Sequence, residues 1–118
     1  MAETAGTDWT RAEVEAIVED HLDMLAHELA GARYNKTAHR DALAMRLPGR
    51  SDGAIEFKHA NISAVLLAHR FPFIPGYKPR GNYQGLLEDV VLARVLDDPR
   101  LLALAAAVAL GTAGCTTA

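Results

Sequence analysis

Cysteine, aromatic residues and long apolar runs are all scarce in this sequence. Cys115 is the single cysteine among 118 residues, so the chain cannot form an internal disulfide, and a lone thiol is typical of a reducing compartment. The most apolar run, residues 101–110, has ten residues, about half of the roughly 20 that a helix needs to cross a bilayer. Residues 1–13 lack the apolar segment of a signal peptide. These absences predict a cytoplasmic protein without membrane contacts.

Motifs for cofactors and for covalent catalysis are also missing. The chain has no glycine-rich phosphate loop and no nucleophile elbow. His21 and His27 are six positions apart and do not share a helical face, and the other histidines show no zinc-binding spacing. We therefore expect no cofactor and no metal site, and we favour a protein that is not an enzyme.

Charge is segregated along the chain. Residues 1–31 carry a net charge of −7, residues 32–85 carry +6 and residues 86–118 carry −2, within a total of −3. Segregation of this kind can place a positive face on an acidic protein. The alternative is that the acidic first helix packs beside the basic segment and neutralises it.

Helix signals are clearest at the start of the chain. Thr10 and Glu13 have the spacing of a capping box, Trp9 and Val14 have that of a hydrophobic staple, and Gly31 is a typical C-terminal stop. Apolar residues recur between them at three- and four-residue steps. The pattern predicts a helix over about residues 10–30.

Further helices are expected at about residues 36–47, 51–69 and 82–96, followed by a short alanine-rich helix from Pro99. Residues 54–58 also alternate like a strand, although helix is favoured there. Prolines exclude regular structure at 71–81, where an apolar loop should pack on the core. The predicted fold class is all-α, a compact bundle of four to five helices with a Pro-rich loop at about 70–81.

One domain of this length can bury a core without metals or disulfides. We expect an N-terminal arm at residues 1–9, a helical module at 10–98, and an alanine-rich helix and flexible tail at 99–118. The predicted core consists of Trp9, Val14, Ile17, Val18, Leu25, Leu29, Leu43, Leu47, Ile55, Ile62, Leu66, Leu86, Val90 and Val91, with Phe57 and Val65 as further candidates.

Polar side chains suited to nucleic acid gather in the basic middle segment. On a helix, Lys58, His59 and Ser63 are predicted to share one exposed face while Ile55 and Ile62 point inward. Lysine and arginine bind phosphate, amides and hydroxyls contact phosphate or base edges, and tyrosine stacks on bases. Helix N-termini expected near Ser51 and Asn82 add backbone donors. The predicted nucleic-acid-binding residues are Arg50, Ser51, Lys58, His59, Asn61, Ser63, Tyr77, Lys78, Arg80, Asn82 and Gln84.

Two other functions stay open at this point. A protein-interaction or dimerisation module would present Phe71, Phe73 and Tyr77 as an exposed apolar patch. A metal-dependent nuclease would use Glu56 and Lys58, whose Glu-x-Lys spacing occurs on a strand of a common nuclease core.

Four segments carry distinctive motifs, at residues 9–14, 34–40, 50–66 and 76–84. They include Arg50-Ser51, Glu56-Phe57-Lys58-His59, Asn61-Ile62-Ser63 and Gly76-Tyr77-Lys78-Pro79-Arg80. Together these motifs resemble a bacterial N-terminal helical domain of unknown function, found ahead of restriction-endonuclease-like domains in multidomain proteins. The resemblance covers about residues 8–96 and implies a non-catalytic module that recognises DNA, such as modified or foreign DNA, while a catalytic partner domain or protein does the chemistry. Because the chain ends soon after the module, we expect a truncated or stand-alone version.

Overall fold

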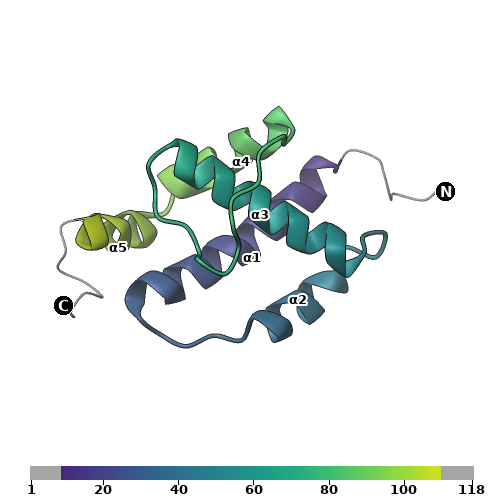
Figure 1. Cartoon of the computed structure of the whole chain (residues 1–118), viewed down its shortest axis with the longest axis horizontal. Helices are drawn as coiled ribbons and strands as arrows, with labels where there is room; N and C mark the ends of the chain where they lie inside the picture. Colours follow the sequence, from purple (N-terminus) through teal and green to yellow (C-terminus); the bar gives the residue numbers. More distant parts are fainter. Residues whose placement is uncertain (1–8, 110–118) are drawn as a thin grey trace.

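The computed structural model describes residues 9–109 (Figure 1). The expected tail at 110–118, with Cys115, and residues 1–8 of the expected arm lie outside the described residues. Within 9–109 the chain contains helices and no strand, which confirms the all-α prediction. The helices are α1 (Arg11–Ala30), α2 (Lys36–Ala44), α3 (Asp52–Ala68), α4 (Gly85–Leu96) and α5 (Pro99–Ala109).

Local signals explain where α1 begins and ends. The Thr10 hydroxyl accepts from the backbone N–H of Glu13, and the Glu13 carboxylate accepts from the backbone N–H of Thr10, which completes the predicted capping box. Trp9 and Val14 are both buried beside this turn. Gly31 ends the helix at φ 73°, a left-handed conformation that glycine adopts without a steric penalty.

Helix α1 is the central element of the bundle. It packs against each of the other four helices, and α3 also packs against α2 and α4. Figure 1 shows α3 crossing α1, with the irregular segment that follows α3 passing over the pair. Of the predicted core residues, Leu86 is partly buried and the other thirteen are buried, as is Val65. Phe57 was expected to point inward, but its side chain is half exposed.

Two helices are shorter than predicted. Helix α2 ends at Ala44, and the expected last turn of that helix is irregular backbone up to Leu47. Helix α4 begins at Gly85 instead of about Asn82, because Asn82 has φ 61°, which no right-handed helix accommodates. The N-terminal donors of α4 are therefore displaced from the place where the sequence put them.

The last helix belongs to the same core. Asp98 caps it through Oδ1, which accepts from the backbone N–H of Leu101 at 3.0 Å. Leu101 and Ala105 are buried in the main apolar cluster, on the side of α5 that packs against α1 and α4. The hydrophobic core thus extends past residue 98, where the sequence placed the end of the module.

The capping box gives a first testable expectation. Thr10→Ala removes the side-chain acceptor for the N–H of Glu13, and we expect the free energy of unfolding to fall by about 1 kcal/mol. The measurement is urea denaturation followed by the fluorescence of Trp9, the single tryptophan. Thr37→Ala is the control, since Thr37 is exposed within α2 and caps nothing among the described residues. Equal losses in the two variants would contradict the capping role.

Candidate functional site

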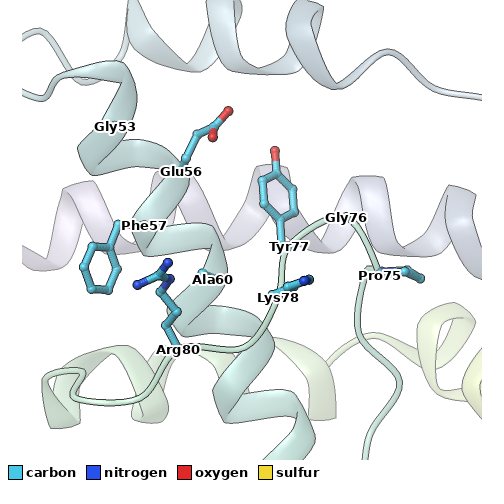
Figure 2. Close-up of a pocket in the computed structure, with 9 residues that line it drawn as sticks. All are labelled: Gly53, Glu56, Phe57, Ala60, Pro75, Gly76, Tyr77, Lys78 and Arg80. Atoms are coloured by element: carbon cyan, nitrogen blue, oxygen red, sulfur yellow. The ribbon is translucent and has the colours of Figure 1, made fainter.

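A hollow lies between α3 and the loop that follows it. It has a volume of about 600 Å³. Figure 2 shows its lining, with side chains from the N-terminal half of α3 on one side and the loop 75–80 on the other. We call it the α3 groove, and it is lined by Gly53, Glu56, Phe57, Ala60, Pro75, Gly76, Tyr77, Lys78 and Arg80.

Local contacts hold the loop side of the groove in place. The backbone N–H of Arg80 donates to the carbonyl of Ala60 at 3.1 Å, which joins the loop to α3. Ile74 and Tyr77 are buried, and they anchor the loop to the core between its prolines. The groove is therefore formed by a packed loop, as the apolar character of residues 71–77 predicted.

Positive charge gathers at the groove. Lys78 and Arg80 are exposed, and neither forms an ion pair with a described residue. Lys36 reaches the same loop from α2, since its Nζ donates to the carbonyl of Gly76 at 3.3 Å and lies 4.1 Å from the centre of the Tyr77 ring. A side chain at Gly76 would displace Lys36, because an added Cβ would lie 3.0 Å from its Nζ. The one carboxylate of the groove, Glu56, is paired with Arg40 at 3.5 Å.

An aromatic surface accompanies these cations. Phe57 is 50% exposed, and the Arg80 guanidinium carbon lies 5.6 Å from the centre of its ring. Part of this apolar ring is therefore accessible to a ligand beside a cationic group. Phe57 was not among the predicted site residues, because its place in the apolar spacing of residues 55–66 indicated a core position.

Arg50 is not on this surface. Its side chain is 3% exposed, and Nη2 and Nε donate to the two carboxylate oxygens of Glu13 at 2.9 and 3.2 Å. This bidentate pair lowers the pKa of the Glu13 carboxyl, with the Arg50 hydrogen bond as the main cause. The guanidinium also lies 4.8 Å from the centre of the Trp9 ring. Arg50 thus joins the start of α3 to the start of α1.

Lys58 and His59 are buried as well. Lys58 is 9% exposed, with Nζ 5.0 Å from the centre of the Trp9 ring. His59 contacts His21 of α1 through Nδ1 at 2.8 Å, and its ring stacks on Tyr77 with centroids 4.5 Å apart. Ser63, one turn further along α3, is fully buried. The prediction of one exposed face shared by Lys58, His59 and Ser63 is therefore wrong, because α3 crosses the bundle with apolar and polar sides both covered.

The two buried histidines form a coupled pair. A single N–H can lie between the two Nδ1 atoms, so one ring donates and the other accepts. Burial lowers the pKa of His59 to about 3 and holds the pKa of His21 well below its ordinary value. Both Nε2 atoms are buried without a hydrogen-bond partner in residues 9–109. Tyr77, which packs on both rings, has its pKa raised by burial to about 12.

The other predicted residues fall into different places. Asn61 is buried, and its Nδ2 donates to the carbonyls of Arg80 and Gly81 at 2.5 and 3.1 Å. Ser51 is exposed but caps α3 through the N–H of Ala54. Gln84 is partly buried and donates to the carbonyl of Trp9. Asn82 is exposed in the loop before α4. Of the predicted set, the structure gathers Tyr77, Lys78 and Arg80 at the groove, and Tyr77 is buried beneath it.

Carboxylates of α1 neutralise part of the basic segment at residues 32–85, which was the alternative to a positive face in the sequence-based prediction. Beside the Arg50–Glu13 pair, Arg46 pairs with Glu19 at 3.3 Å, and His39 of α2 contacts Asp20 at 2.7 Å. Burial raises the pKa of the Asp20 carboxyl, with His39 acting in the opposite direction. The cations of the loop, Lys78 and Arg80, remain outside this neutralised region.

Asn61 offers a test of how the loop is held. Asn61→Ala removes both side-chain donors to the loop carbonyls, and we expect it to lower the free energy of unfolding by about 1–3 kcal/mol. Asn61→Asp should be worse, since a carboxylate would face two carbonyl oxygens. Urea denaturation measures both changes. An aspartate variant as stable as the wild type would contradict the assigned hydrogen bonds.

Geometry also bears on the two alternative functions. Glu56, Phe57 and Lys58 are helical, so Glu56 and Lys58 point to different sides of α3, one exposed and one buried. The strand geometry that the nuclease hypothesis requires is thus missing at this triplet. Phe71 and Phe73 are partly buried against the core and Tyr77 is buried, so the exposed apolar patch expected of an interaction module does not form there. Within residues 9–109 no cluster of three or more His, Cys, Asp or Glu side chains could hold a metal ion.

Comparisons with protein-family models, with curated proteins and with solved structures found no match to this chain. The resemblance described above is therefore neither supported nor opposed by them. None of the described helices is long and apolar enough to span a membrane.

Proposed function

We propose that this protein is a non-catalytic DNA-binding module, and that DNA contacts it at the α3 groove. The observation that carries the proposal is the presence of Lys78 and Arg80 at the rim of a hollow of about 600 Å³, exposed and without an ion-pair partner in the described residues. Cationic side chains of this kind bind phosphate oxygens. The choice of DNA over other polyanions rests on the family resemblance.

A second hollow makes a useful contrast. It has a volume of about 220 Å³ and lies between α1 and the α4–α5 region, where Arg94 and Arg100 face three carboxylates, Glu19, Asp23 and Asp98. Arg94 lies 4.0 Å from Glu19. Acidic groups outnumber cations there, so phosphate is disfavoured. The α3 groove is the better phosphate site of the two.

If cations of this site bind phosphates, the affinity for DNA should fall as the salt concentration rises. With phosphates on Lys36, Lys78 and Arg80, the logarithm of the association constant should fall with the logarithm of salt concentration, with a slope of about −2 for single-stranded DNA and about −3 for duplex. Fluorescence anisotropy with a labelled DNA hairpin that carries a single-stranded arm presents both duplex and unpaired DNA. The double variant Lys78→Ala/Arg80→Ala should reduce the slope to about −0.7.

The control is the double variant Arg33→Ala/Arg100→Ala. Arg33 and Arg100 are exposed, and neither lines the α3 groove. This variant changes the net charge of the protein by the same amount as the groove variant. Equal losses of affinity in the two double variants would show that binding follows net charge and not the groove. No binding to either part of the hairpin at low salt would remove the proposed function.

A further inference from the structure

The shape of the α3 groove restricts what kind of DNA it can take. Proteins that read a duplex by direct contact insert a protruding helix or ribbon into one of its grooves. Here the candidate surface is a hollow, of a size within the roughly 300–1,000 Å³ of ligand pockets. The face of α3 that carries Lys58, His59 and Ser63 is buried and cannot enter a major groove. A hollow accepts a group that projects from the DNA, and an unstacked nucleotide is such a group.

The lining suits the parts of a nucleotide. Phe57 is half exposed, and a base can stack on the part of its ring that Arg80 does not cover. Lys78 and Arg80 offer positive charge for the phosphate. Stacking on such faces tolerates any base identity, since every base has a π face.

The charges at the two edges of the α3 groove determine how a nucleotide would be oriented in it. In Figure 2 the Glu56 carboxylate lies at the opposite edge of the groove from Lys78 and Arg80. Its side chain is 53% exposed and paired with Arg40, so that edge has no net positive charge to attract a phosphate. The phosphate therefore stays beside Lys78 and Arg80, and the base or sugar, which carry hydrogen-bond donors, approaches Glu56.

From these observations we infer that the α3 groove binds one unpaired nucleotide of a DNA strand, with the base stacked at Phe57 and the phosphate at Lys78 and Arg80. The inference rests on the proposed function and narrows it to single-stranded, bulged or otherwise unpaired DNA. Perfect duplex binds only through the cationic rim, because taking a base out of the stack costs free energy.

The test compares a single strand, its perfect duplex, and the same duplex with one bulged nucleotide, by anisotropy at low salt with the whole chain. We expect the single strand and the bulged duplex to bind at least about 10-fold more tightly than the perfect duplex. Phe57→Ala should weaken single-strand binding by about 5- to 150-fold, the range seen when a stacking aromatic is removed. The same variant should leave duplex binding unchanged.

Leu67→Ala is the matched control for Phe57→Ala. Leu67 lies on the same helix and is 52% exposed, but it is not part of the groove. Urea denaturation of both variants shows that they remain folded. If Leu67→Ala weakens single-strand binding as much as Phe57→Ala does, the inference is overturned.

Three further outcomes would overturn the inference. Equal affinity for the three DNAs, together with a loss only in the Lys78→Ala/Arg80→Ala variant, would leave the proposed function standing and exclude the unpaired nucleotide. If a free deoxynucleoside monophosphate competes for the groove as well as the single strand does at the same concentration of nucleotide, the groove binds free nucleotides and not a DNA strand. Failure to bind any of the DNAs would overturn the inference and the proposed function together.

Discussion

Glu13→Ala is expected to cost about 3–5 kcal/mol of the free energy of unfolding, because it removes the carboxylate that pairs with the buried Arg50 guanidinium. The Arg50 side chain is 3% exposed and donates to both carboxylate oxygens of Glu13, at 2.9 and 3.2 Å. A surface cation could turn to water after such a change, but Arg50 is enclosed beside Trp9. The loss also includes the capping box of α1, to which Glu13 belongs.

The control for this change is Glu15→Ala, two positions along the same helix. Glu15 pairs with Arg11 at 3.5 Å, and both side chains are about half exposed or more. An exposed pair of this kind contributes at most about 1 kcal/mol. Denaturation followed by Trp9 fluorescence measures both variants. If the losses of the two variants differ by less than about 1 kcal/mol, the buried role of the Glu13–Arg50 pair is contradicted. An exposed pair contributes about 0–1 kcal/mol, so the Glu13–Arg50 pair would then be no stronger than an exposed one.

The second large effect is a loss of stability in mild acid. The folded protein keeps His21 and His59 neutral, since burial holds the pKa of His59 at about 3 and that of His21 well below 6.5. The unfolded chain protonates both near the ordinary value of 6.5. Stability is therefore complete above about pH 6.5 and falls as the pH decreases, because the unfolded state takes up protons that the folded state does not.

The size of the effect follows from the same linkage. Between about pH 7 and about pH 5 His59 alone lowers the free energy of unfolding by about 2 kcal/mol, and His21 adds to the loss in the same direction. The nearby positive charge of Lys36 acts in the same direction as burial on His59. Urea denaturation at the two pH values measures the change.

A double variant isolates this pair from the other histidines. His21→Gln/His59→Gln removes both titrating groups. This variant should be less stable than the wild type at pH 7, but it should lack the part of the loss of stability down to about pH 5 that these histidines cause. His69→Gln is the control, since His69 is exposed and contacts Glu88 at the surface. If the double variant loses stability in acid as steeply as the wild type does, other groups are responsible for the pH dependence.

The helices could be predicted from sequence because their signals are local. Capping residues and apolar spacing lie within one or two turns of the backbone they control, and the Thr10 capping box forms as predicted. The predicted start of α4 was wrong, also for a local reason. The left-handed backbone at Asn82 is compatible with its residue type but is not required by it.

The candidate site was harder to predict because burial depends on distant partners. Nothing near Arg50 or His59 in the sequence indicates that Glu13 and His21, 37 and 38 positions earlier, will cover them. Lysine and arginine are rarely buried, so a surface position was the sound expectation for Lys58. Lys78 and Arg80 are exposed in the proline-bounded loop after α3, but their role in binding stays a prediction.

The most direct measurement is an amide NMR titration of the whole chain with a short single-stranded DNA. If the α3 groove is the DNA site, the shifted amides cluster at residues 53–60 and 75–80, and the shifts disappear in the Lys78→Ala/Arg80→Ala variant. Shifts that cluster instead on the α1–α4–α5 side, or that persist in this variant, would contradict the central claim.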